Sequence, residues 1–209
     1  MMQNQINTKE RYPSVTTISG MLDKPFLVKW ANNLGKKNID VTEYVANQAK
    51  KGTLIHSIVE SHVTKESIYL DKYTEEEIYN ASNIFYNNYM NWENKHTFEF
   101  IFSEKYLVSN TYKFGGKVDI YCILDGKYTV IDLKTSKSVN EEQILQVSAY
   151  KPLLEENNYK VDQILILNLK KEIGEAEIRF ISEEEQYNYF EIFKHLLSIY
   201  FIKKEIGWK

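Results

Sequence analysis

The stretch from Gly116 to Lys134 reads GKVDIYCILDGKYTVIDLK, and it decides the fold of this chain. It holds two apolar, β-branched runs joined by Asp-Gly, which is the strongest short signal for a two-residue hairpin turn. The strands that it predicts are Phe114–Leu124 and Lys127–Ser136. Counting back from the turn places Asp119 directly opposite Asp132.

Two carboxylates in these positions should repel each other. Cross-strand Cβ atoms lie ~4.5–5.5 Å apart, and two charges at ~5 Å repel by roughly 3 kcal/mol at an effective dielectric constant of ~20. The residues around them are mostly apolar on both faces of the hairpin, which predicts central strands that are covered on both sides. A divalent cation between Asp119 and Asp132 would offset the repulsion, and oxygen ligands suit Mg²⁺ or Mn²⁺.

Lys134 follows Asp132 by two residues, so its ammonium group is expected on the same face as both carboxylates. In such a site the cation can polarise a phosphoryl oxygen and acidify a bound water, while the lysine positions or deprotonates that water. A surface ion pair is the alternative interpretation of an isolated Asp-x-Lys pattern. The apolar strands around this one favour the hydrolytic metal site.

Outward from the hairpin, the pattern changes at about residue 96. Upstream of it, helices are expected to begin near Ser14, Pro25, Asp40, Thr53 and Thr74. Gly52 is expected to interrupt the helix that begins at Asp40. Downstream, we expect strands over 98–108, 161–169 and 175–181 and helices over 139–155 and 183–204.

These elements predict an α/β fold in which a mixed β-sheet is flanked by helices. A single domain is expected over 13–209, with a mainly helical part at 13–95 and the sheet core and C-terminal helix at 96–209. The polar, aperiodic residues 1–12 are expected to form a flexible arm.

The composition excludes several classes of protein. The 209 residues are 43% hydrophobic and 26% charged, which is the balance of a globular domain and not of a disordered chain. A single cysteine, Cys122, cannot by itself bind a four-cysteine iron–sulfur cluster. The net charge of −3 gives no global nucleic-acid signature, so any contact with nucleic acid must be local. With no membrane span and no export signal, we expect a cytoplasmic protein of a bacterial or phage-infected cell.

Motifs along the chain resemble the PD-(D/E)XK nuclease superfamily, and in particular its RecB-like branch. The resemblance lies in 116–119 (GKVD), 131–135 (IDLKT), 52–56 (GTLIH) and 146–150 (QVSAY), in the order that the family shows. The segment 13–16 (PSVT) and Trp30 are also similar to the opening of phage-type RecB-like exonucleases and of the mitochondrial genome maintenance exonuclease. The resemblance implies a restriction-endonuclease-like fold.

The resemblance also assigns roles at the metal site. It implies that His56, Asp119 and Asp132 are metal ligands, together with the backbone carbonyl of Leu133, and that Lys134 is the catalytic lysine. Glu104 resembles the acidic residue that precedes the glycine-Asp motif and can contact the metal or its water. Glu60, one helical turn beyond His56, is either a second carboxylate that orients the imidazole or a solvated side chain.

Other residues are assigned to catalysis and substrate. By the resemblance, Gln146 supports Lys134 and counts among the catalytic residues, and Tyr150 contacts the DNA strand, although both could form a polar helix edge. The further substrate contacts that we expect are Ser14, Thr16, Thr135 and Lys137. Lysine pairs such as Lys170-Lys171 are candidate phosphate contacts or solvated helix ends.

The activity that the resemblance implies is metal-dependent hydrolysis of DNA, as an exonuclease on single-stranded or end-containing DNA in replication, recombination or repair. The expected cofactor is Mg²⁺ or Mn²⁺, without an iron–sulfur cluster. The expected partners are DNA and a helicase, recombinase or single-strand-binding protein, and no membrane. A structure-specific endonuclease and a catalytically silent DNA-binding or recombination-partner module are the alternatives.

Overall fold

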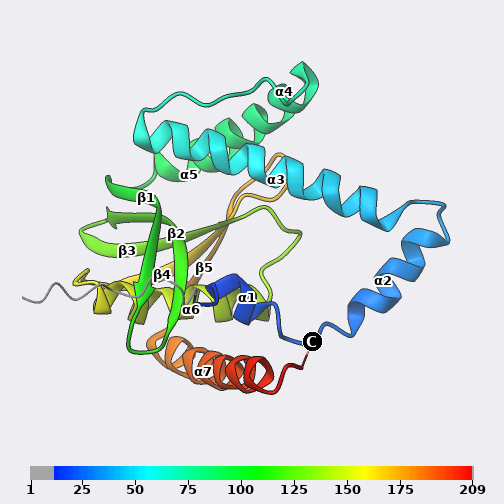
Figure 1. The fold of residues 1–209 in the computed structure, drawn as a ribbon. Coiled ribbons are helices and arrows are strands. Elements are labelled where there is room, and N and C mark those ends of the chain that lie inside the picture. Colours follow the sequence, from blue (N-terminus) through cyan, green and yellow to red (C-terminus); the bar gives the residue numbers. More distant parts are fainter. Residues whose placement is uncertain (1–11, 209) are drawn as a thin grey trace, which may run out of the picture.

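A five-stranded sheet with the strand order β1-β2-β3-β4-β5 forms the centre of the structure, a computed structural model that describes residues 12–208 (Figure 1). The strands are β1 (Phe98–Ser109), β2 (Phe114–Leu124), β3 (Lys127–Lys134), β4 (Gln163–Asn168) and β5 (Glu177–Ile181). All neighbours are antiparallel except β3 and β4, which are parallel and are joined by a crossover through α6 (Glu141–Glu156). The predicted mixed α/β sheet is confirmed.

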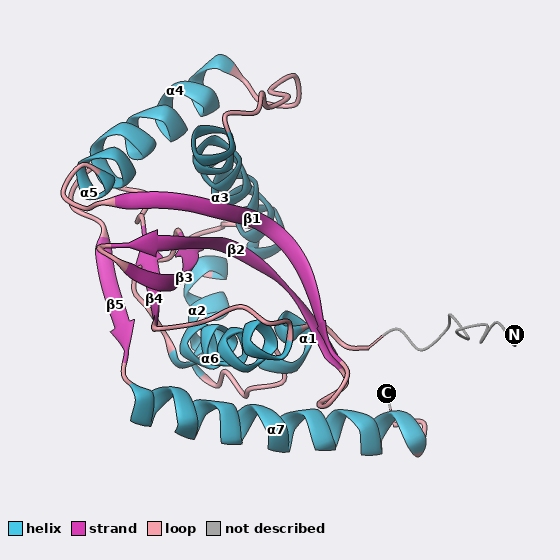
Figure 2. Ribbon diagram, turned by 90° about the vertical axis from the view of Figure 1, so that its left-hand side faces the viewer, coloured by secondary structure: helices cyan, strands magenta, loops and turns pink. Residues whose placement is uncertain are grey.

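Helices cover both faces of this sheet (Figure 2). On one face lie α1 (Val15–Ser19), α6 and α7 (Glu183–Glu205). On the other lie α3 (Val41–Thr64), α4 (Glu75–Ile84), the π-helix η1 (Phe85–Met90) and α5 (Asn91–Glu93). Helix α2 (Phe26–Gly35) buries no residue and lies to the side of the sheet in Figure 1.

The hairpin between β2 and β3 has the predicted turn and register. Asp125 and Gly126 both have positive φ, 50° and 80°, as a type I′ turn requires. Leu124 pairs with Lys127, and the ladder continues to Ile120 opposite Ile131. Residues of β2 and β3 enter the apolar core on each side of the sheet, so these strands are covered on both faces as expected.

Some predicted element boundaries are wrong. Gly52 does not interrupt a helix, because α3 runs without a break from Val41 to Thr64 and packs its apolar residues against the sheet. The helix predicted after Thr74 begins there with a capping box but changes to π geometry at Phe85–Met90. The predicted flexible arm, apart from Tyr12, lies outside the described residues.

Gly116 gives a stability prediction. A Cβ added at this position would lie 2.8 Å from Val15 Cγ2 and 2.9 Å from Tyr150 Cε1, both in the core on the α6 side. The substitution Gly116→Ala is therefore expected to lower the free energy of unfolding by roughly 1–3 kcal/mol through overpacking, as measured by urea denaturation. Gly174→Ala is the matched control and should be nearly neutral, since no atom lies within 4 Å of its Cβ position. Equal stability of the two variants would contradict the prediction.

Candidate active site

Asp119 and Asp132 lie on neighbouring strands just beyond the last recorded β2–β3 pair, Ile120 with Ile131. Asp132 is fully buried on β3. Asp119 is partly exposed, and its Oδ2 accepts a hydrogen bond from the backbone N–H of Leu133 at 2.9 Å. Burial raises the pKa of both carboxyl groups, that of Asp132 to about 6, and the charge of Asp119 adds to the shift at Asp132.

The ammonium group of Lys134 lies beside both carboxylates. Its Nζ is 2.6 Å from Asp132 Oδ2, so the predicted placement of the two side chains on one face is confirmed. Burial acts to lower the pKa of Lys134, but the charges of Asp132 and Asp119 raise it more, and the net pKa lies above its usual value. Lys134 is therefore protonated at neutral pH in this arrangement.

His56 faces the same site from α3. It lines an open groove of about 420 Å³ together with Leu133, Lys134 and Thr135. Burial and the nearby charge of Lys134 lower the pKa of His56 to about 4, and Asp132 opposes this shift. The imidazole is therefore neutral at pH 7, which is the form that binds a metal ion.

One face of α3 forms a wall of the groove. Tyr44, Gln48, Gly52 and His56 follow one another at intervals of four residues, so they lie roughly above one another on the helix, and all four line the groove. A Cβ at Gly52 would lie only 2.9 Å from Thr135 Oγ1. The glycine thus allows α3 to approach the segment that follows β3, which brings His56 near Lys134.

Gln146 and Tyr150 reach the site from α6. Gln146 Nε2 lies 3.4 Å from Asp132 Oδ1 and donates a hydrogen bond to the Tyr150 hydroxyl at 2.9 Å. Tyr150 is buried, and burial raises its pKa well above the usual value. Tyr150 is thus placed to support Gln146, and a direct contact with the substrate would require the buried ring to become accessible.

Two further acidic residues lie around Asp119. Glu104 on β1 has a left-handed backbone with φ of 51° and forms an ion pair with Lys117. Val118 packs in the core on the α6 side, whereas Ile120 packs in the core on the α3 side, so the regular alternation of β2 is broken at Asp119. Glu60 makes no recorded hydrogen bond to His56 within 12–208, and its charge acts to raise the pKa of Asp119.

The chemistry of these donors fits a hard divalent cation. The site offers two carboxylates and a neutral imidazole, and Asp132 Oδ2 has no hydrogen-bond partner besides its ion pair with Lys134. The structure does not bring the donors into a closed set, because within 12–208 no three His, Cys, Asp or Glu side chains lie close enough together to hold a metal. The ammonium group of Lys134 contacts Asp132 Oδ2, the oxygen atom that would have to bind the metal ion.

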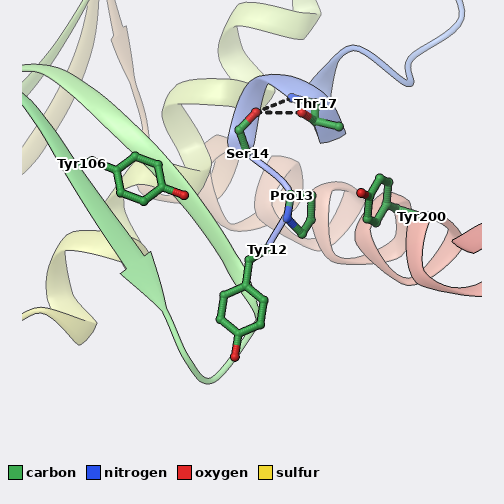
Figure 3. Close-up of a pocket in the computed structure, with 6 residues that line it drawn as sticks. All are labelled: Tyr12, Pro13, Ser14, Thr17, Tyr106 and Tyr200. Atoms are coloured by element: carbon green, nitrogen blue, oxygen red, sulfur yellow. Dashed lines mark hydrogen bonds between the residues drawn. The ribbon is translucent and has the colours of Figure 1, made fainter. Parts of the chain in front are cut away.

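The predicted substrate contacts fall into separate places. Thr135 lines the groove, and Lys137 is exposed in the loop that follows. Ser14 instead lines a second cavity of about 510 Å³, with Tyr12, Pro13, Thr17, Tyr106 and Tyr200 (Figure 3). Its hydroxyl caps α1 by accepting from Thr17 N at 3.0 Å and lies 2.9 Å from the exposed Thr16 hydroxyl. The structure does not bring Ser14 and Thr16 to the groove.

Sequence reasoning missed Tyr44 and Gln48, which extend the groove away from His56 to Trp30. The rings of Trp30 and Tyr44 meet edge to face with centroids 6.0 Å apart. The signal that could have found them is the four-residue spacing before His56. The interruption that the sequence predicts at Gly52 conceals this spacing.

Comparison with known proteins identifies the fold and not the family. No family model matches the chain, and no curated protein matches it. Among solved structures, the chain is similar to the crystal structure of the "Putative exonuclease" from Eubacterium rectale, with a TM-score of 0.53, 10% sequence identity, and coverage of 76% of this chain and 69% of the other. At this identity, the similarity concerns the overall fold alone. Within 12–208, no helix has the length and apolar character needed to cross a membrane.

Proposed function

We propose that this protein is a metal-dependent deoxyribonuclease that hydrolyses phosphodiester bonds at the end of a DNA strand. The observation that carries the proposal is the buried Asp132–Lys134 pair, beside Asp119 and the neutral His56, at the wall of an open groove. A binding surface alone has no need for buried carboxylates whose ionisation the fold opposes. Similarity to a structure named as an exonuclease supports the same reaction class.

The residues have distinct roles in this proposal. His56, Asp119 and Asp132 would hold the cation, which when bound supplies Lewis acidity toward a phosphoryl oxygen. Lys134, protonated in the metal-free arrangement, would donate hydrogen bonds and stabilise the negative charge that develops on the phosphate. Gln146 holds the Asp132 carboxylate from the α6 side.

The shape of the groove supports a strand that continues past the reaction site. It extends from His56 and Lys134 along α3 to Trp30 and Tyr44, whose aromatic rings offer a surface for bases. This is more than a small-molecule phosphodiester would need, and it favours a nucleic acid as the substrate.

End-labelled linear and circular single-stranded DNA, and the corresponding duplexes, test the proposal with Mg²⁺, Mn²⁺ or EDTA. We expect cleavage of linear DNA that requires the metal, while circular DNA stays intact. Cleavage of circles would instead support the endonuclease alternative. Binding of DNA without cleavage under any metal condition would support the DNA-binding module and overturn the proposal.

A further inference from the structure

The side chain of Lys171 lines the groove, and its ammonium group has no role in the proposed reaction. It is half-buried in the loop between β4 and β5, and its Nζ donates to the backbone oxygen and to Oε1 of Gln48, both at 2.9 Å. Within 12–208 it has no carboxylate partner, whereas the neighbouring Lys170 pairs with Glu177 at 3.5 Å. Burial and the nearby charge of Lys51 lower the pKa of Lys171, so the protein itself leaves this charge uncompensated.

The loop that carries Lys171 is held by one buried polar side chain from the α3 side of the sheet. Asn88, in the π-helix η1, is 1% exposed. Its Nδ2 donates to the carbonyl oxygens of Leu169 at 2.6 Å and Glu172 at 3.0 Å, and more weakly to that of Lys170 at 3.3 Å. Its Oδ1 accepts from Gly174 N at 3.0 Å. One amide side chain thus fixes both ends of the segment 169–174.

The π geometry explains how Asn88 reaches this loop. A π-helical turn inserts an extra residue into the helical repeat and rotates the following side chains, and such turns recur at functional sites. Here the π-helical segment contains Asn88, the residue that binds the loop. Four hydrogen bonds to backbone groups, made by a fully buried polar side chain, are costly to lose and fix the position of the loop.

We infer that Lys171 binds a backbone phosphate of the DNA strand, at a site separate from the phosphodiester that is hydrolysed, and that Asn88 is its positioning residue. The inference rests on the proposed function. Lys171 is hydrogen-bonded to Gln48, which lies eight residues before His56 on α3. This separation corresponds to about 12 Å of helix rise. The phosphate bound by Lys171 therefore lies farther along the groove than the reacting one.

Substitution Lys171→Gln tests the phosphate contact. Binding of a fluorescent single-stranded oligonucleotide is measured in EDTA from 50 to 300 mM salt, and steady-state cleavage is measured with metal. We expect the slope of log affinity against log salt to fall by about 0.7, the value for one lost phosphate contact on a single strand. KM should rise several-fold with kcat within about twofold of the wild type, because the contact is made equally in the ground state and the transition state.

Lys170→Gln is the matched control, since Lys170 is the adjacent lysine, pairs with Glu177 and does not line the groove. It should keep the salt slope and KM of the wild type. An unchanged salt slope in Lys171→Gln, or a loss confined to kcat, would overturn the inference. A wild-type protein that cleaves DNA under these conditions keeps the proposed function in place in either case; a wild type that neither binds nor cleaves DNA overturns both.

The role of Asn88 is tested by a double-mutant cycle. Asn88→Ala should reduce the salt slope as Lys171→Gln does, and the two changes together should have no greater effect than either alone. Additive effects would show that Asn88 does not act through Lys171. If circular dichroism shows that Asn88→Ala does not fold, Asn88→Ser provides the second test, because its hydroxyl keeps a small polar group beside the loop while the amide donors are lost.

Discussion

Replacing Lys134 with alanine is expected to lower the rate of DNA cleavage by about a thousandfold, the usual effect of removing a group that stabilises transition-state charge. The ammonium group is held 2.6 Å from a fully buried carboxylate and is protonated, so the substitution removes a positive charge from the site. Single-turnover cleavage with Mn²⁺ should show the loss in the chemical step, while the affinity for DNA measured in EDTA changes little.

Lys127→Ala provides the control for this variant. Lys127 begins the same strand, is exposed and lies at the opposite end of β3 from the groove, so its removal should leave the cleavage rate unchanged. Circular dichroism establishes that the Lys134→Ala protein is folded at the assay temperature. A folded Lys134→Ala protein with more than a tenth of wild-type activity would remove Lys134 from the mechanism.

The second large effect is expected for Asp132→Asn, which should lower activity but raise the stability of the fold. Asp132→Asn should abolish cleavage and yet stabilise the metal-free fold at pH 8. Burial raises the pKa of Asp132 from 3.8 to about 6, and such a shift corresponds to roughly 3 kcal/mol of folding free energy that is lost when the carboxyl group ionises. Asparagine has nearly the same shape and never pays this electrostatic cost.

The pH dependence follows from the direction of the shift. Because the folded-state pKa of Asp132 lies above its usual value, its contribution to stability is complete below pH 3.8 and is lost as the pH rises through about 6. The difference in unfolding free energy between Asp132→Asn and the wild type should therefore grow in favour of the variant from pH 4 to pH 8, by on the order of 3 kcal/mol. Urea denaturation at several pH values in EDTA measures it.

Asp162 supplies a control with the opposite sign. Hydrogen bonds from Lys160 and from the backbone N–H of Tyr128 lower its pKa, so Asp162→Asn should lose stability relative to the wild type as the pH rises. Adding Mn²⁺ at pH 8 should stabilise the wild type, by about 2.7 kcal/mol at a hundred times the dissociation constant, and should not stabilise Asp132→Asn. A variant less stable than the wild type at pH 8 without metal would show that the ionised Asp132 is not under electrostatic strain.

How much of the site could be predicted depends on the range of the interactions. Asp119, Asp132 and Lys134 are related by a two-residue turn and by the two-residue period of a strand, both of which are local, and their proximity follows directly from the sequence. The position of His56 depends on α3 crossing the end of β3, where Gly52 meets Thr135. The order of the motifs predicts that His56 lies near the carboxylates. The contact between α3 and the end of β3 that places it there joins segments more than 70 residues apart.

Local sequence was misleading where packing overrode propensity. Gly52 is a poor helix former, and its isolated preference predicted a break. The apolar residues that follow it, among them Leu54, Ile55 and Val59, are buried against the sheet, and this burial outweighs the roughly 1 kcal/mol cost of one glycine in a helix. Similarly, Ser14 resembled a substrate contact by its motif, whereas its hydroxyl caps α1.

The sequence by itself determined the β2–β3 hairpin, the class of the sheet and the pairing of an acidic site with a lysine, because turn chemistry and side-chain alternation act between residues close in the chain. Only the tertiary structure decided which side chains surround that site. Asn88 and Lys171 are 83 positions apart, and neither belongs to a motif. They act together because a buried amide must find hydrogen-bond partners wherever the fold places them, and here those partners are the backbone groups of the loop that carries Lys171 into the groove.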